Sequence, residues 1–507
     1  MKRALGCVVL GTFLLGCVET PAPVAPPPPV VAPPQPPVEP PAPAGDPAPV
    51  TEGAVTSGTV RGVQVLVKRV PGEFVAAKLC VRGGARNIDE KTAGVENLAI
   101  NVAVSGGTKT LDKSAFARKL ASLGAQLGGG AGNDFATFEA KAPKAGFDDT
   151  FGLLVDAFRS PALPAGEVEV ARQRVLAELH HEAESPDGRL WTLERKQLFA
   201  GHPYANRPMG TLETVPRFQV AELAAHLERL RETSRLVLVV VGDVDAAHVF
   251  DLVARGLGDL PKGAFVDTPI PPLVFEKSRL VTEQREMPTN YVTSAFVAPR
   301  QSDPDYIVGL VAISGLSHRL WDEVRTKRNL SYSVYSYINS GLSRPFGQLS
   351  VTAVDPNAAM KVMLDEVRRL QTDPLPDAEL AGFKSVFLTG HLQTRELVDW
   401  QAYGLVEALI LGGDWHLAQG IPERVRAVSA ADIQTFAKKY LTHLQAAVLG
   451  DPAKVDAALF TSFLGAAQKE LNPQDRQEKK GIPRAGCSHK PSTTRQGSCP
   501  EPWRWPT

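Results

Sequence analysis

The chain has 507 residues, a length that suggests about two to four domains. Its hydrophobic content of 43% and charged content of 22% are ordinary for a globular protein. Lys plus Arg and Asp plus Glu number 55 each, so there is no basic excess for binding nucleic acid and no acidic excess for binding a cationic partner.

The first 17 residues, MKRALGCVVLGTFLLGC, predict a bacterial lipoprotein signal peptide. Two basic residues precede an apolar run that is too short to span a bilayer. The run ends in LLGC, which resembles a lipobox, so Cys17 is expected to carry a lipid anchor, although a plain signal with an incidental cysteine is the alternative. Residue 18 is Val, not the Asp of the usual inner-membrane retention signal. We expect a lipid-anchored protein of the bacterial cell envelope, at the outer membrane or on the periplasmic face.

The two polar or proline-rich ends of the chain predict no packed structure. Residues 18–56 are rich in Pro, Ala and Val, a composition that favours extended polyproline II, so they predict a semi-rigid linker. Residues 471–507 hold few apolar side chains and predict a disordered tail. Cys487 and Cys499 lie in this tail, and an exported compartment would permit them to pair, but the sequence does not decide whether they do.

From residue 57 to about 470 the chain alternates strand-like and helix-like segments, which predicts an α+β or α/β fold. Residues 63–70 and 73–81 are β-rich and are separated by Pro71-Gly72, so a β-hairpin is expected there. Cys80 is expected to be a buried small side chain. The further expected elements are a strand at 134–142, helices at 167–184 and 220–230, a strand at 234–245, a helix at 429–441 capped by Ser429, and a strand at 445–452.

One unit of this pattern occurs twice. A helix and then a Val/Leu-rich strand end in Gly242-Asp243, and the same order ends in Gly450-Asp451. We therefore expect two homologous domains, at 57–265 and 266–470, joined through a Pro-rich stretch.

Several segments in order resemble the pitrilysin/insulinase (M16) peptidase family in its short two-domain bacterial form. The matching segments are GVENLAINVAVSGGTKT (94–110), LASLGAQLGGGAGNDFATFEA (120–140), ARQRVLAELHHEAESPDG (171–188), HPYANRPMGTLETV (202–215), VVVGDVD (239–245) and GLSHRLWDEVRTKRNLSYSVYS (315–336). The resemblance implies two LuxS/MPP-like α+β domains, each a mainly antiparallel sheet packed with helices, facing each other across a chamber. It also implies that unfolded peptide binds there, partly by strand addition.

The same resemblance places a lost zinc site in this chain. The family's inverted zinc motif has two histidines four residues apart, a glutamate before the second, and a distant glutamate ligand. These positions hold Asn97, Asn101, Ile100 and Glu178, respectively. A neutral amide is a poor zinc ligand, and Ile cannot transfer a proton. We expect this chain to bind no catalytic zinc, and Glu178 to share a polar pocket with the two asparagines.

A rebuilt metal site from Glu178, His180 and His181 is the alternative reading of that helix. Solvated histidines on a helix surface are the simpler interpretation, and no HxxEH or HExxH motif occurs in the 507 residues.

The second half keeps RTKRNLSY, in which Arg325 and Tyr332 match the pair that contacts the substrate main chain in this family. An arginine and a phenol can donate hydrogen bonds to a peptide carbonyl and to a developing oxyanion. Surface and core roles for the two residues are the alternative. The resemblance implies a non-catalytic subunit that binds peptide and needs no cofactor itself, with zinc supplied by an M16 partner in a heterodimer.

Two other functions stay open at this point. One is a peptide-binding or scaffold protein of the same fold with no role in proteolysis. The other is an active metalloendopeptidase with an atypical site.

Overall fold

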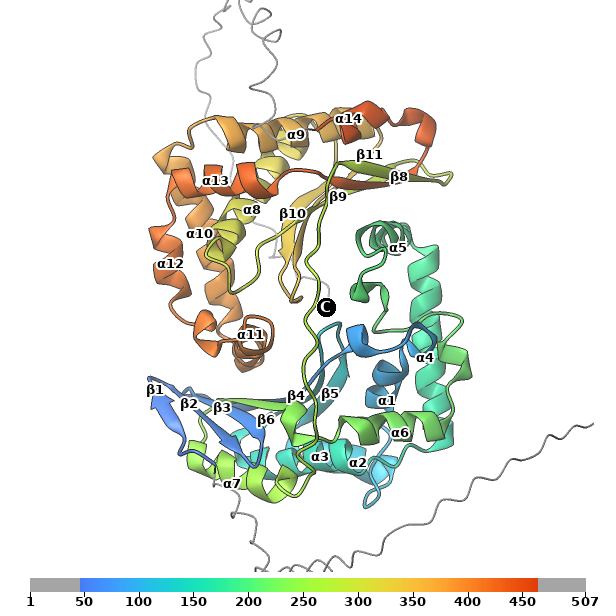
Figure 1. Cartoon of the computed structure of the whole chain (residues 1–507), viewed down its shortest axis with the longest axis vertical. Coiled ribbons are helices and arrows are strands. Elements are labelled where there is room, and N and C mark those ends of the chain that lie inside the picture. Colours follow the sequence, from blue (N-terminus) through green and yellow to red (C-terminus); the bar gives the residue numbers. More distant parts are fainter. Residues whose placement is uncertain (1–45, 464–507) are drawn as a thin grey trace, which may run out of the picture. The chain divides into compact units, whose positions relative to one another are not determined.

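The computed structural model describes residues 46–463, in which two β-sheets are packed with helices (Figure 1). The signal peptide with Cys17, most of the predicted linker, and the predicted tail with Cys487 and Cys499 lie outside the described residues. The strands are β1 (Val50–Glu52), β2 (Val55–Val60), β3 (Val63–Arg69), β4 (Phe74–Arg82), β5 (Gln126–Ala131), β6 (Phe135–Pro143), β7 (Leu236–Gly242), β8 (Arg279–Gln284), β9 (Asn290–Val297), β10 (Ser333–Asn339), β11 (Phe346–Ala353) and β12 (Gln445–Gly450). The α-helices are α1 (Val95–Ala103), α2 (Lys113–Leu123), α3 (Phe147–Arg159), α4 (Ala165–Glu184), α5 (Pro186–Leu198), α6 (Val220–Leu230), α7 (Ala246–Leu257), α8 (Tyr306–Leu320), α9 (Pro356–Thr372), α10 (Asp377–Thr394), α11 (Val398–Ile410), α12 (Ile421–Ala427), α13 (Ala430–Tyr440) and α14 (Ala457–Thr461).

The two sheets share one topology, which confirms the predicted repeat. The first sheet has the order β1-β2-β3-β7-β4-β6-β5, and the second, read from β8, has the order β8-β12-β9-β11-β10. β7 lies parallel to β3 and antiparallel to β4, and β12 likewise lies parallel to β8 and antiparallel to β9. Gly242 and Gly450 end the two equivalent strands, and a Cβ there would lie 2.8 Å from Val75 or 2.2 Å from Asn290, so each turn needs glycine.

The predicted hairpin of residues 63–70 and 73–81 is wrong, because β7 lies between β3 and β4. All seven residues of β7 are buried, and a strand that is apolar on both faces requires neighbours on both edges. Pro71-Gly72 does mark the end of β3, but a turn signal does not decide which strands pair. Cys80, in β4, is fully buried, as expected.

The linker prediction is also wrong at its C-terminal end. Residues 50–52 form β1 and residues 55–60 form β2, which adds an antiparallel edge to the first sheet. Val55 is only 2% exposed. The proline content of the whole segment obscured this short β-branched stretch at its end. Elsewhere the predicted strands and helices are found, and Ser429 caps α13 by accepting a hydrogen bond from the Asp432 amide.

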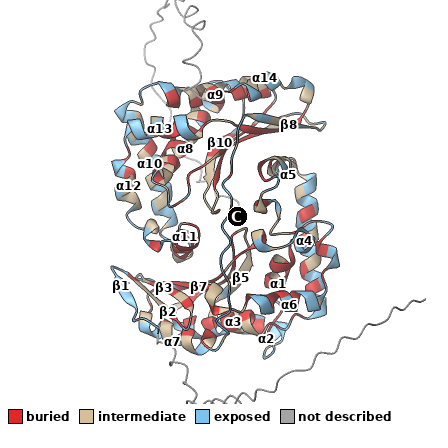
Figure 2. Ribbon diagram, in the orientation of Figure 1, coloured by how far each residue is buried: buried red, intermediate tan, exposed pale blue. Residues whose placement is uncertain are grey.

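Each sheet is covered on one face by the helices of its own half. Buried side chains of α1, α3, α4, α6 and α7 pack on the first sheet, and those of α8, α9, α10 and α13 pack on the second. Figure 2 shows the buried residues on the sheets and on the helix faces turned toward them. No helix within residues 46–463 is long and apolar enough to cross a membrane.

The other face of each sheet is covered by a helix from the opposite half. Helix α11 packs on β4 and β7 of the first sheet, and α5 packs on β8, β9 and β12 of the second. We call α5 and α11 the exchanged helices, because each covers the sheet of the other half. Ion pairs join them to those sheets: Lys141 of β6 contacts Asp399 of α11 at 2.6 Å, and Arg189 of α5 contacts both carboxylate oxygens of Glu283 of β8 at 2.6 Å. Because the exchanged helices pack each half of the chain against the other, both sheets belong to one compact unit that begins at Asp46.

The exchanged helix α5 carries a buried carboxyl group, Glu194, which is 1% exposed. Desolvation raises the pKa of Glu194 to about 7, although the side chain accepts a 2.6 Å hydrogen bond from Gln348 of the second sheet. The protonated form fits this site, so its stabilising contribution is complete below the unfolded pKa of 4.5 and is lost as the pH rises through about 7.

We expect Glu194→Gln to remove much of this pH dependence. Denaturation between pH 5 and pH 8 should show a loss of unfolding free energy on the order of 3 kcal/mol in the unsubstituted chain, and a smaller loss in the variant. The exposed Glu184, changed to Gln, is the control and should leave the profile unchanged. Identical profiles for Glu194→Gln and the unsubstituted chain would contradict the assignment.

Candidate functional site

Helix α1 lies at the position where the family resemblance expects zinc ligands. It begins after Gly94, whose φ of 93° and close approach to Gly210 leave no room for a side chain. Ile100 is fully buried in the core of the first half, whereas Asn97 and Asn101 are half-buried. The residue in the general-base position therefore packs as a core side chain, and Ile100 would be within 2.8 Å of a Cβ placed on Gly129 of β5.

The two asparagine amides are engaged with protein groups. The amide nitrogen of Asn101 donates to the Asn97 carbonyl at 2.8 Å and to the Asn97 side-chain oxygen at 3.2 Å. That oxygen of Asn97 also accepts from the Ala131 amide of β5 at 3.4 Å. The Asn101 oxygen accepts from the Arg174 guanidinium at 2.9 Å. A permanent cation of the protein therefore lies against the second ligand position.

The prediction that Glu178 shares a polar pocket with the two asparagines is wrong. Glu178 is exposed and makes no hydrogen bond to either asparagine, and Arg174, one helical turn earlier on α4, contacts Asn101 instead. His180 and His181 are also exposed. Within residues 46–463 no three His, Cys, Asp or Glu side chains lie close enough together to hold a metal ion. The side chains gathered here are the amides of Asn97 and Asn101, the Ile100 side chain and the Arg174 guanidinium, and none of them is a suitable zinc ligand.

A second group of candidate residues lies at the end of α8. There the helix continues as a π-helix over Trp321–Thr326, a geometry that often occurs at functional sites. Asn329, with φ of 49°, then reverses the chain, and its amide donates to the Arg325 carbonyl at 3.0 Å. This turn brings Tyr332 back onto Arg325.

The Arg325 guanidinium is stacked between two aromatic rings. Its carbon lies 3.8 Å from the centre of the Trp321 ring and 3.9 Å from the centre of the Tyr332 ring. Such contacts contribute about 0.5–1 kcal/mol each at exposed sites. Within residues 46–463 the Arg325 side chain makes no hydrogen bond and no ion pair. Because stacking uses only the faces of the guanidinium, its N–H edges stay available to an acceptor.

Tyr332 also lines a pocket of about 450 Å³, and its side chain is 68% exposed. Asp187 of α5 and Val354 after β11 also line this pocket. The pair predicted from RTKRNLSY is therefore brought together by the fold. No hydrogen bond, ion pair or ring contact within the described residues joins this pair to Asn97 or Asn101.

Sequence reasoning missed Trp321 and Arg174. Each lies four residues before a residue that the sequence did single out, Arg325 and Glu178, respectively. That spacing places both members of each pair on one face of a helix, and it was the available signal.

Two models of one peptidase family match the chain. The insulinase (peptidase family M16) model matches residues 64–211, and the peptidase M16 inactive-domain model matches residues 217–387. The chain is similar to a Helicobacter pylori protein named non-peptidase homolog YmxG, at 22% identity over 368 residues, which is 71% of this chain and 85% of that one. It is also 25% identical to subunit 1 of the Bos taurus mitochondrial cytochrome b-c1 complex over 262 residues, which is 49% of this chain and 53% of that one.

A solved structure with the same fold supports this relationship. The peptidase M16 inactive domain from Pseudomonas fluorescens superposes with a TM-score of 0.70 at 19% identity, covering 78% of this chain and 97% of that one. Together with the repeated sheet topology, these matches confirm a two-domain M16 fold. The chain belongs to the M16 (insulinase) peptidase family.

Proposed function

We propose that this protein is a non-catalytic, lipid-anchored M16 subunit that binds unfolded peptide and acts with a zinc-bearing M16 partner. The observation that carries the proposal is the Arg325 guanidinium, which is held between Trp321 and Tyr332 with its N–H edges unused by the described residues. A preorganised donor that satisfies no group within the described residues is suited to an acceptor on a ligand.

Peptide backbone is the ligand that best fits this arrangement. Arg325 can donate two parallel hydrogen bonds to carbonyl oxygens, and the exposed Tyr332 hydroxyl can donate a third. Strands β5 and β10 are each an outer strand of their sheet, and no strand within residues 46–463 pairs with their outer edge, so an extended peptide can add there. In the proposed heterodimer the partner's zinc supplies the Lewis acid and the activated water. This chain orients the peptide and stabilises negative charge on its carbonyl oxygen.

The test is a peptidase assay of the full chain mixed with an M16 homologue from the same source that has an intact HxxEH helix. We expect the mixture to cleave an unfolded peptide and this chain alone to be inactive. Arg325→Ala should lower kcat/KM of the mixture by about 100-fold, because one lost oxyanion donor costs about 3 kcal/mol. Arg328→Ala is the matched control, since Arg328 is exposed and pairs with Glu323. Equal activity of the Arg325→Ala and Arg328→Ala mixtures would contradict the proposal.

The anchor is tested separately through Cys17. In a bacterial host, the unsubstituted chain should fractionate with membranes and incorporate labelled fatty acid, whereas Cys17→Ser should lose the label and appear in the soluble envelope fraction. Acyl chains contribute about 0.8 kcal/mol per buried methylene, so the shift should be nearly complete. Labelling that persists in Cys17→Ser would rule out this residue as the anchor.

A scaffold role without proteolysis is the second candidate, and it is favoured by the similarity to a cytochrome b-c1 complex subunit. It predicts that Arg325→Ala leaves the partner's activity unchanged while the complex still forms. An active peptidase with an atypical metal site is the third candidate, and it predicts chelator-sensitive cleavage by this chain alone.

A further inference from the structure

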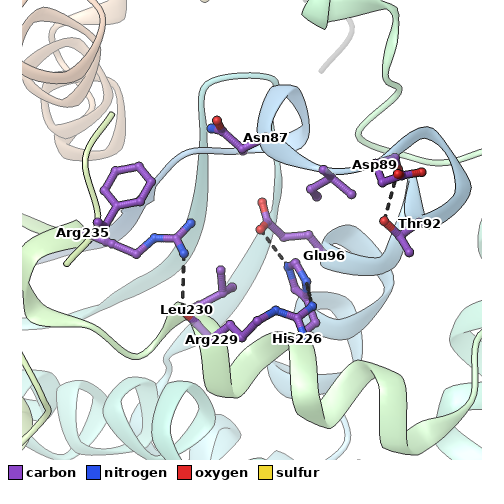
Figure 3. Close-up of a pocket in the computed structure, with 11 residues that line it drawn as sticks. Asn87, Asp89, Thr92, Glu96, His226, Arg229, Leu230 and Arg235 are labelled. Atoms are coloured by element: carbon purple, nitrogen blue, oxygen red, sulfur yellow. Dashed lines mark hydrogen bonds and ion pairs between the residues drawn. The ribbon is translucent and has the colours of Figure 1, made fainter. Parts of the chain in front are cut away.

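A separate pocket lies on the first half of the chain, beside the N-terminal turn of α1 (Figure 3). It has a volume of about 400 Å³, within the range of small-ligand sites. Its walls come from the loop before α1, from the end of α6 and from the segment after α7, and they include Asn87, Glu96, His226, Arg229 and Arg235.

The pocket contains a buried carboxylate that is only half satisfied. Glu96 is 2% exposed, and one of its oxygens accepts a 2.9 Å hydrogen bond from His226. The other oxygen has no partner within the described residues. In Figure 3 that oxygen points away from His226, toward the side of the pocket where Asn87 lies. A buried carboxylate oxygen without a donor is costly, so it favours a ligand that brings one.

The pocket also has a cationic group with unused donors. The Arg229 guanidinium is 3.1 Å from His226 Nδ1. Because arginine only donates, Nδ1 accepts and the Nε2–H of His226 faces Glu96. Arg229 is exposed and forms no ion pair within residues 46–463, so its other N–H groups are free. Arg235 is different, since it donates to the carbonyls of Arg82 and Arg229.

The Glu96 oxygen and the free N–H groups of Arg229 are thus separated by the His226 ring, and the exposed carboxylate of Asp89 also lines the pocket. The ring and its hydrogen bonds of 2.9 and 3.1 Å span the gap between Glu96 and Arg229. A ligand that satisfies both must carry a cationic donor at one end and a carboxylate at the other. An α-amino acid carries both groups on one carbon atom, which is too short for this separation. A dipeptide places a peptide bond between them and fits the volume.

We propose that this pocket binds a short zwitterionic peptide, with its terminal ammonium on Glu96 and its carboxylate on Arg229. The site is distinct from Arg325 and Tyr332 and does not depend on the proposed role of that pair. It makes the protein a receptor for small peptides as well as a contact surface for long ones.

The test is a ligand-observed NMR or calorimetric titration of the full chain with glycylglycine. We expect saturable binding in the millimolar range. N-acetylglycylglycine lacks the ammonium and glycylglycinamide lacks the carboxylate, so each should bind at least tenfold more weakly. Glu96→Gln and Arg229→Met should each weaken glycylglycine binding at least tenfold. Arg217→Met, at an exposed arginine that does not line the pocket, is the matched control and should bind normally.

Three results would overturn the proposal. The absence of a saturable glycylglycine signal would mean that no peptide ammonium binds the Glu96 oxygen. Binding of glycylglycinamide equal to that of glycylglycine would exclude recognition of the carboxylate. Binding weakened as much by Arg217→Met as by Arg229→Met would reduce the effect to general surface charge. Because Arg229 is exposed, its substitution tests the site even if Glu96→Gln fails to fold.

Discussion

Val406→Asp is expected to lower the free energy of unfolding by at least about 4 kcal/mol, because it buries a charge that has no partner. Val406 is fully buried on α11, in a cluster with Leu66, Ala76 and Val239 of the first sheet. The substitution disrupts the packing of α11, which belongs to the second half of the chain, on the sheet of the first half. It should therefore affect the stability of both halves, although it changes a residue of only one.

Chemical denaturation measures this effect, and Leu392→Asp is the matched control. Leu392 lies on α10, just before α11, and is 53% exposed, so its substitution should change the unfolding free energy by no more than about 0.5 kcal/mol. We further expect Val406→Asp to split a single transition into two as the halves lose their mutual support. One transition at an unchanged midpoint would show that the exchanged helix does not hold the halves together.

Restoring the two histidines alone is expected not to restore zinc binding, whereas restoring them and removing Arg174 is. In Asn97→His/Asn101→His, the Arg174 guanidinium would still lie against the second ligand, since it contacts Asn101 at 2.9 Å. Adding Arg174→Glu removes this charge and places a carboxylate at the α4 residue that contacts position 101, as the third protein ligand. Three protein ligands are the usual number in catalytic zinc sites.

Metal analysis after dialysis measures this result directly. We expect zinc near one equivalent in the triple variant, and little in the double variant or the unsubstituted chain. Arg172→Gln in the double variant is a control, because Arg172 is two residues away and donates to the carbonyls of Val215 and Phe218. Stoichiometric zinc in the double variant would show that Arg174 does not oppose the metal. No peptidase activity is expected even in the triple variant, because Ile100 still occupies the general-base position.

Local and repeated sequence signals predicted much of this protein. The spacing of apolar residues identified the strands β3, β4, β6, β7 and β12 and the helices α4, α6 and α13, and the two Gly-Asp turns identified two homologous halves. Asn97, Ile100 and Asn101 indicated a zinc motif without ligands, and the motif RTKRNLSY indicated the pair Arg325 and Tyr332. Each of these signals depends on side-chain type over a few residues, so it is present in the sequence before any folding is considered.

Other features arise only when distant segments meet. β7 lies between β3 and β4 in the sheet, although more than 150 residues separate β4 from β7 in the sequence. The reason is that a strand that is apolar on both faces is stable only in the middle of a sheet. The contact of Arg174 with Asn101 depends on how α4 crosses α1. The hydrogen bond to one oxygen of the buried Glu96 carboxylate comes from His226, which lies 130 residues away in the chain. The sequence alone thus specified several of the elements, the repeat and, through the family resemblance, the expectation of a zinc motif without ligands. Tertiary packing decided the strand order, the exchanged helices and the polar partners, because pairing and desolvation depend on distances in space that no local pattern encodes.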